Sequence, residues 1–271
     1  MSIKDEKYST EHRKFCCDTA VQGTNRNEWE RRHLLVSKAE KIRNTLEEIP
    51  VHTLIDTSSL CRTFPDIPEK TCCKVLERMT KSGSLVRLTK GLYYRPKKTR
   101  FGTVPMSEDE IIRYYTENNI GVVVGYAMYN RYGLTTQVGK NVRILSNAVR
   151  EEKKKIGTVS IEKAGVKIDD ATRVILEVLD VLQNYSAIED LNRSMLASFL
   201  AEFCRRHSDS AAVCVLDERK YKKRTIAFMK AVLDDQGVRN SLGKYLSNLS
   251  KYQIPEMDEI FAAASAQGKH Q

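Results

Sequence analysis

Two prolines three residues apart, Pro65 and Pro68, constrain the fold of this chain more than any other local feature. A proline inside a helix removes a backbone hydrogen bond and clashes with the preceding turn, so a continuous helix through this segment is strongly disfavoured. The residues on both sides nevertheless have helical character. We expect a short helix from Ser58 or Ser59 to Phe64, and a second helix that begins near Pro68 and ends at Lys81. Asp66, with Glu69 three residues later, is the expected N-cap of the second helix.

Regular patterns flank this pair of helices. Apolar residues spaced by three and four predict an amphipathic helix over 34–49, which ends before Pro50. A β-like segment follows over 51–55. Beyond the second helix, residues 85–88 and 92–95 predict a hairpin around Thr89-Lys90-Gly91, with Leu88 paired to Leu92. That register points Val86 and Tyr94 inward, and Arg87, Tyr93 and Arg95 outward. The order of elements is typical of a winged helix-turn-helix, which we expect over residues 34–103.

The positive charge of the chain is concentrated in this region. Residues 60–103 contain eleven basic and three acidic side chains, a local balance of +8 in a chain of 271 residues whose net charge is +10. A concentration of one sign favours a polyanionic partner, and we expect double-stranded DNA. The alternatives are a solvated basic face and a winged helix that contacts protein.

The expected DNA-binding residues follow from their places in these elements. Lys70, Thr71 and Lys74 occupy the first turns of the second helix, where side chains of groove-inserted helices contact bases. Arg78, further along the helix, is expected to contact a phosphate. Five further side chains are expected as phosphate clamps: Arg87, Lys90, Arg95, Lys97 and Lys98.

Three further segments complete the predicted organisation, which is α+β and predominantly helical. Residues 104–166 are expected to form a small α/β domain: a helix after the capping box Ser107–Glu110, a buried strand over 120–125, a short helix over 126–132, and strands over 142–145 and 157–161. Residues 167–262 predict a helical domain with helices from Thr172, over 191–203, over 222–233 and over 238–249. Residues 1–33 and 263–271 are expected to be a flexible arm and tail.

Four stretches of the sequence carry a family resemblance: SLVRLTKGLYYRPKKTRFGTVP, IIRYYTENN, VVVGYAMYNRYGLTTQVGK and VRILSNAVREEKKKIGTVSI. Together they resemble the AbiEi-type antitoxin family of abortive-infection systems, over about Ser37 to Lys163. The resemblance implies a transcriptional regulator that represses its own operon and counteracts a nucleotidyltransferase-like toxin. It assigns a characteristic antitoxin segment to the second domain: Tyr126, Tyr129, Leu134, Thr135, Thr136 and Gln137. The resemblance leaves open whether the toxin is contacted directly and which oligomeric state the protein has. An alternative function is a ligand-responsive repressor unrelated to a toxin.

The sequence favours a protein without catalytic activity or a cofactor. It contains no nucleophile with its base and no phosphate-binding loop at a diagnostic spacing. The seven cysteines form neither a CxxC motif nor a zinc-finger spacing, which favours free thiols over disulfides or a metal site. The longest apolar stretch, residues 120–128, is far too short to cross a membrane, so we expect a cytoplasmic protein with no membrane partner.

Overall fold

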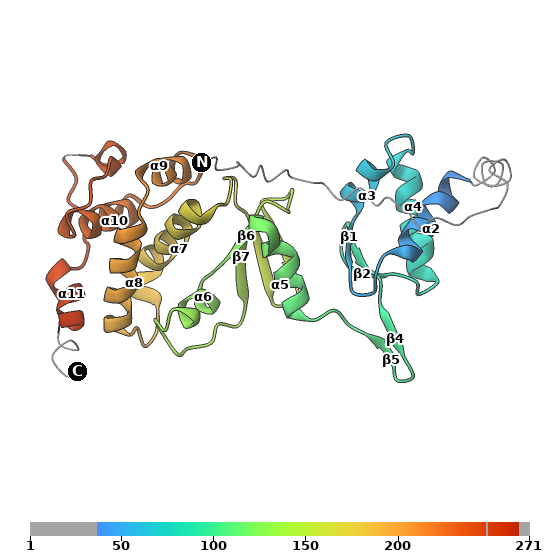
Figure 1. Ribbon diagram of the computed structural model, residues 1–271, viewed down its shortest axis with the longest axis horizontal. Helices are drawn as coiled ribbons and strands as arrows, with labels where there is room; N and C mark the ends of the chain where they lie inside the picture. The colour runs from blue at the N-terminus through green and yellow to red at the C-terminus, as the bar shows by residue number, and fades with distance from the viewer. Residues whose placement is uncertain (1–36, 248, 266–271) are drawn as a thin grey trace, which may run out of the picture.

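The computed structural model describes residues 37–247 and 249–265. The predicted N-terminal arm therefore lies outside the described residues. The fold is a mixture of helices and strands arranged in a row (Figure 1). Residues 37–94 form a helical unit with a small sheet, a larger sheet follows in the middle, and helices gather at the opposite end. No helix in the described part of the chain is long and apolar enough to cross a membrane.

The first unit has the predicted order of elements. It comprises α2 (Lys38–Glu48), β1 (Leu54–Asp56), α3 (Thr57–Thr63), α4 (Glu69–Lys81), β2 (Val86–Thr89) and β3 (Leu92–Tyr94). The three strands form one antiparallel sheet in the order β1-β3-β2. Apolar faces of the helices meet in a core whose fully buried members include Ile42, Leu46, Cys72 and Leu76.

Side chains set two of the three helix starts. Ser37 accepts a hydrogen bond from the backbone N–H of Glu40 at the start of α2, and Asp56 accepts one from Ser59 at the start of α3. The expectation that Asp66 caps α4 is wrong. Pro68 occupies the N-cap position and α4 has no side-chain cap, because Asp66 lies two residues too early to reach the first free N–H groups.

The predicted register of the β2–β3 hairpin is confirmed at its open end and shifted by one residue next to the turn. Val86 pairs with Tyr94 as expected, but Thr89, not Leu88, pairs with Leu92. An irregularity between Arg87 and Thr89 inserts Leu88 as an extra residue, as in a β-bulge. Tyr94 is buried and Arg87 exposed, as predicted.

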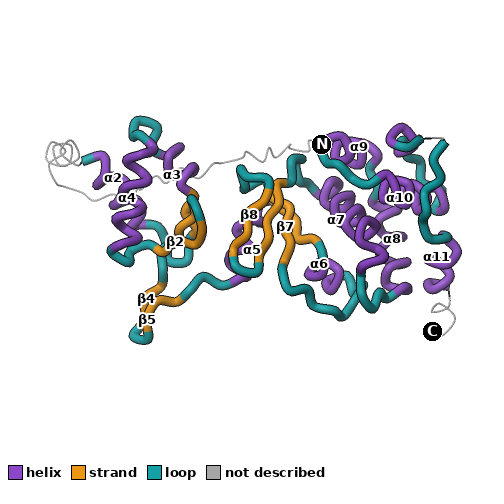
Figure 2. Tube along the Cα trace, turned by 180° about the vertical axis from the view of Figure 1, so that it is seen from behind, coloured by secondary structure: helices purple, strands orange, loops and turns teal. Residues whose placement is uncertain are grey.

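A second hairpin was not predicted. β4 (Lys97–Thr99) pairs with β5 (Gly102–Val104) through a two-residue turn, Arg100-Phe101. Gly102 has φ +118°, a conformation that side chains with a β-carbon rarely adopt. The hairpin extends away from the rest of the molecule (Figure 2).

The middle of the molecule is a four-stranded sheet with helices on both faces. Its elements are α5 (Glu108–Thr116), β6 (Gly121–Val124), α6 (Tyr126–Arg131), β7 (Val142–Ser146), β8 (Lys153–Ile156) and β9 (Val159–Lys163). The strand order is β6-β7-β9-β8, with only the β7–β9 pair parallel. The capping box Ser107–Glu110 is confirmed. β8 was missed because its three lysines suggest a loop; it is an edge strand, where exposed lysines are common.

The C-terminal helices agree with the predictions in part. The structure contains α7 (Asp170–Asn184), α8 (Arg193–Arg206), α9 (Asp209–Glu218), α10 (Lys223–Asp235) and α11 (Met257–Ser265). α7, α8 and α10 were predicted; α9 and α11 were not. The predicted helix over 238–249 is wrong, because only Leu242–Tyr245 form a short 3-10 turn. Asn240 there accepts a hydrogen bond from the backbone N–H of Leu242, which competes with helix formation. The tail predicted over 263–271 is wrong for its first three residues, because α11 continues to Ser265; residues 266–271 lie outside the described part of the chain.

The apolar cores run across the predicted domain boundaries. One core joins Val122 and Leu145 of the sheet to α7 and the helices behind it, for example through Leu179. A second joins Ile144, on the opposite face of the sheet, to α5 and to Tyr94 of the first unit. The boundaries predicted after residues 103 and 166 therefore separate segments that share buried contacts.

Candidate nucleic-acid interface

The outward face of α4 is cationic. Lys70, Lys74 and Arg78 are exposed, whereas Cys72, Val75, Leu76 and Met79 bury the opposite face of the helix. None of these three cations forms an ion pair with a carboxylate of the described residues; Lys81, further along, pairs with Glu77 at 2.8 Å. Thr71 lies half-buried at the edge of the same face. The positive charges of Lys70, Lys74 and Arg78, all predicted to bind DNA, are therefore open to a ligand.

The predicted phosphate clamps do not lie together. Arg95 is half-buried, and its guanidinium donates a hydrogen bond of 2.5 Å to the carbonyl oxygen of Ile49, so it does not point outward as predicted. Lys97 and Lys98 are exposed on β4. Lys98 Nζ lies 4.0 Å from where a β-carbon on Gly83 would be, which places β4 close to the C-terminal end of α4.

Arg87 and Lys90 line a cleft between the first unit and the sheet of the middle region. The cleft has a volume of about 530 Å³. Five cationic side chains line the cleft. Arg62, Arg87 and Lys90 come from the first unit, and Arg150 and Lys154 come from the loop before β8 and from β8 itself. Asp56, Glu69 and Glu151 contribute negative charge, and Tyr93 and Tyr114 contribute aromatic surface. The turn before β3 is held at this cleft, because Thr57 donates a backbone hydrogen bond of 2.9 Å to the Gly91 carbonyl.

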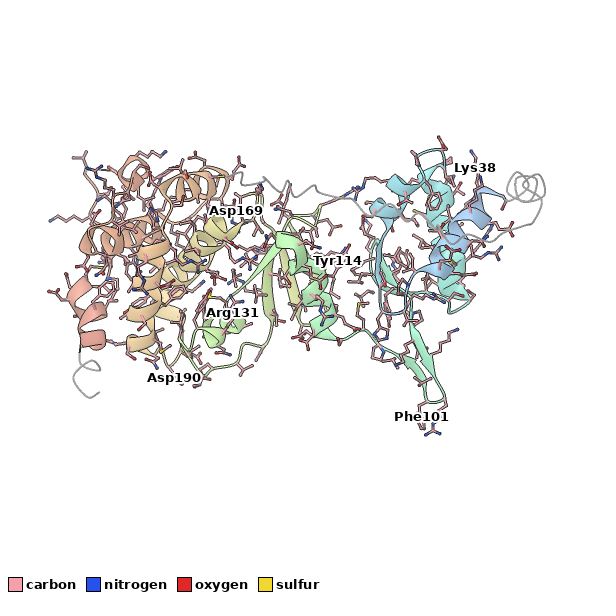
Figure 3. All side chains as sticks on the ribbon, in the orientation of Figure 1. Lys38, Phe101, Tyr114, Arg131, Asp169 and Asp190 are labelled. Atoms are coloured by element: carbon pink, nitrogen blue, oxygen red, sulfur yellow. The ribbon has the colours of Figure 1, made fainter. Side chains whose placement is uncertain are left out.

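The tip of the β4–β5 hairpin was not singled out from the sequence. Phe101 has 86% of its surface exposed, and the Arg100 guanidinium lies 4.6 Å from the centre of its ring. Figure 3 shows this side chain at the end of the hairpin, away from any other element. The sequence feature that could have indicated this tip is Lys-Lys-Thr-Arg-Phe-Gly, in which three cations precede one aromatic residue and a glycine.

The antitoxin segment packs mainly inward. Tyr129 and Leu134 are buried, and buried Thr135 donates a hydrogen bond of 2.6 Å to the carbonyl of Glu189. Further contacts with the loop before α8 come from Tyr126, whose hydroxyl donates to the carbonyl of Ala187 at 3.2 Å, and from Gln137, which bonds to the carboxylate of Asp190. Thr136 is exposed, as is nearby Val138, at 84%. Of the segment itself, Thr136 is therefore the most open to a partner, together with the neighbouring Val138.

Two buried carboxylates on α7 hold this region together and were not predicted. Asp180 accepts hydrogen bonds from the Gly125 N–H at 2.9 Å, the Tyr129 hydroxyl at 2.7 Å and Arg143 at 3.1 Å. Burial, with the charge of Asp180, raises the pKa of Tyr129 far above its ordinary value, so the hydroxyl stays a donor. Glu177 accepts from Arg131 at 2.7 Å, and Figure 3 shows Arg131 on α6 beside α7. Two acidic residues three positions apart within an apolar helix were the signal for this network.

The described cysteines are free thiols, as the sequence favours. Burial raises the pKa of both Cys61 and Cys204 to about 11, so neither is a thiolate at neutral pH. Within the described ranges, His, Cys, Asp and Glu side chains form no cluster that could hold a metal ion.

Comparison with known proteins finds a family model and similar solved structures. A family of unknown function, DUF6088, matches residues 61–190, which extend from α3 to the loop before α8. The crystal structure of the RV2827C protein from Mycobacterium tuberculosis is similar with a TM-score of 0.36 and 12% sequence identity, over 80% of this chain and 82% of that one. No curated protein sequence matches the chain.

Proposed function

We propose that this protein is a DNA-binding transcriptional regulator with a winged helix-turn-helix over residues 34–103. The observation that carries the proposal is the outward face of α4, where Lys70, Lys74 and Arg78 are exposed without a carboxylate partner among the described residues. α4 follows α3 after a short turn, which is the place of the recognition helix in this class of domain. An α-helix fits the major groove of B-DNA, which is about 12 Å wide.

The proposal assigns a role to each cation near α4. Lys70, Thr71 and Lys74 contact base edges from the first turns of the helix, and Arg78 contacts a phosphate. Lys97 and Lys98 on the β4–β5 hairpin neutralise flanking phosphates, a role that suits exposed cations. Arg87 and Lys90 contribute less, because the turn between β2 and β3 is held beside the cleft.

Salt-dependent DNA binding tests the proposal. We expect full-length protein to bind duplex DNA at low salt, with a slope of log K against log[salt] near −5 if about six phosphates are neutralised. Replacing Lys70, Lys74 and Arg78 together by alanine should reduce both the affinity and the slope. The matched control removes three exposed cations elsewhere, Lys220, Lys222 and Arg224, and should leave binding unchanged. Absence of binding at low salt, or equal losses in both variants, would favour a winged helix that contacts protein.

The antitoxin role rests on the resemblance to the AbiEi-type family. We propose that the protein represses its own operon and counteracts a co-encoded nucleotidyltransferase-like toxin. The exposed residue of the antitoxin segment, Thr136, and the neighbouring Val138 are the proposed surface for a directly bound toxin. A neighbouring reading frame for such a toxin is the first observation to seek, and growth rescue is the functional test.

A ligand-responsive repressor is the second candidate, and the cleft favours it. Its volume of about 530 Å³ suits a small molecule, and its five cations suit an anion. Isothermal titration with pyrophosphate and with adenosine monophosphate tests this candidate. Replacing Arg150 and Lys154 by alanine should abolish such binding without weakening DNA binding, because neither residue belongs to the winged helix unit. If neither probe gives a heat of binding, the cleft does not bind an anionic ligand of this kind and this candidate is wrong.

A further inference from the structure

The β4–β5 hairpin combines two properties that rarely occur together on a free surface. Phe101 is one of the most exposed large apolar residues described, at 86%, and it occupies the tip of an extended two-stranded element. The Arg100 guanidinium lies over its ring, and exposed Lys97 and Lys98 lie on the strand that leads to the tip. An aromatic ring that remains so exposed buries little apolar surface, so it adds little to the stability of the fold.

We propose that the hairpin enters the minor groove of DNA and that Phe101 inserts as a wedge between two base pairs. This proposal rests on the proposed DNA-binding function and adds a second point of contact to it. Proteins that bend DNA through the minor groove use cations around an apolar side chain that partly unstacks a base step. The hairpin provides both, on one short element.

The position of the hairpin relative to α4 supports this assignment. Lys98 lies next to Gly83, directly after the C-terminal end of α4, so the hairpin begins where the proposed recognition helix ends. A helix in the major groove and a hairpin that extends past its end reach adjacent grooves of the same duplex. Figure 1 shows the hairpin projecting freely from this end of the molecule.

The dimensions of the minor groove explain why a bend is expected. The groove is about 6 Å wide, whereas two paired strands already lie about 4.8 Å apart before side chains are counted. The groove must therefore widen to admit the tip, and insertion of the ring at a flexible pyrimidine–purine step accommodates this. Arg100, which covers the ring in the free protein, is then released to a phosphate or a base acceptor.

Fluorescence energy transfer between the ends of a labelled duplex tests the proposal. The probe is an A·T-rich duplex of about 30 base pairs with central TA steps, because these steps deform most easily. Wild-type full-length protein should shorten the distance between the ends. Phe101→Ala should abolish the bend and weaken binding roughly tenfold, whereas Phe101→Leu should keep most of the bend because leucine also serves as a wedge. Leu249→Ala, which removes another highly exposed apolar side chain in the C-terminal region, is the matched control.

The possible results separate this inference from the DNA-binding function. Wild-type binding with a bend that Phe101→Ala leaves intact would overturn the wedge and retain DNA binding. No binding of the duplex by the wild type at low salt would overturn both. A change of oligomeric state in Phe101→Ala, measured by light scattering without DNA, would assign the tip to a protein contact and also overturn the wedge. Circular dichroism of each variant verifies that the fold is unchanged.

Discussion

Single residues at helix starts and in the buried network make distinct contributions to stability. Asp169 caps α7: its carboxylate accepts a hydrogen bond of 2.9 Å from the Thr172 N–H, and Thr172 Oγ1 accepts one of 2.8 Å from the Asp169 N–H. We expect Asp169→Ala to lower the free energy of unfolding by about 1 kcal/mol at pH 7, the usual cost of a lost N-cap. Urea denaturation of the full chain measures it.

The contribution of Asp169 should depend on pH. The hydrogen bond from the Thr172 backbone lowers the pKa of this carboxyl below its ordinary value. The stabilisation is therefore complete above the unfolded-state pKa, near 4, and is lost as the pH falls through the lower folded-state value. The difference between wild type and Asp169→Ala should shrink in acid. Asp169→Asn keeps an acceptor that does not titrate, so a pH-independent difference between wild type and Asp169→Asn would contradict this account.

Asp180 should be far more important than any one of its partners. Asp180→Ala leaves the Tyr129 hydroxyl, the Gly125 N–H and Arg143 without their shared acceptor inside the protein. We expect a loss of about 3 kcal/mol, the low end for a broken buried pair because Arg143 keeps some contact with water. Tyr129→Phe removes one hydrogen bond and should cost about 1 kcal/mol. Similar losses in the two variants, measured by urea denaturation, would contradict a central role for Asp180.

At the scale of elements, α4 and the β4–β5 hairpin should contribute differently to DNA recognition. A helix in the major groove reads base edges, whereas exposed cations on a hairpin contact phosphates, which are the same in every sequence. Lys74→Ala should therefore weaken binding to a specific site by about 1–3 kcal/mol and change non-specific binding less. Lys97→Ala combined with Lys98→Ala should weaken both equally. Parallel titrations of specific and random duplexes measure the effect, and equal losses in both variants would contradict the placement of α4.

The elements that the sequence predicts well are those with strong local signals. Regular apolar spacing located α7, α8 and α10, and the prolines located the turn between α3 and α4. Weak or conflicting signals caused the errors. β8 consists mainly of lysines, and α9 and α11 are short helices whose packing partners lie elsewhere in the chain. The 238–249 segment has helical spacing, but side chains of Asn240 and Asp209 hold its backbone in another conformation.

The candidate site was predictable in its residue types but not in its geometry. α4 exposes Lys70, Lys74 and Arg78 because helical periodicity alone sets its outward face. The positions of the Arg95 and Lys90 side chains depend on neighbours distant in the sequence. Arg95 is bound by the Ile49 carbonyl, and Lys90 faces the cleft formed with the segment after β7. Phe101 was overlooked because a lone aromatic residue has no periodicity, and its exposure follows only from the hairpin.

At the scale of the whole molecule, the unit proposed to bind DNA is tied to the sheet of the middle region. Leu54, Leu92 and Tyr94 share a core with Met106 and Ile111, and His52 Nδ1 lies 2.7 Å from the Glu110 carboxylate. Truncation after residue 103 would expose these apolar side chains and also remove Val104 from the β4–β5 hairpin. Separation of the proposed functions is therefore best tested by substitutions in the full chain.

We expect DNA binding and toxin protection to be separable by such substitutions. Lys70, Lys74 and Arg78 lie on α4, whereas Thr136 and Val138 lie on the loop after α6, beyond the sheet. Replacing the three cations by alanine should abolish repression but preserve rescue from the co-encoded toxin. Replacing Thr136 and Val138 by aspartate should preserve DNA binding and reduce rescue, because new charges on an interface are costly to desolvate.

The decisive measurement is growth with the toxin expressed from an independent promoter, so that repression of the operon cannot imitate protection. Both variants carry only exposed substitutions, so their melting temperatures should stay close to that of the wild type, which excludes unfolding as the cause of a lost function. If wild-type protein fails to rescue growth, the antitoxin proposal is wrong and the cleft-based repressor becomes the leading candidate. If the alanine variant loses rescue together with DNA binding, protection acts through repression, and the loop after α6 has no separate partner.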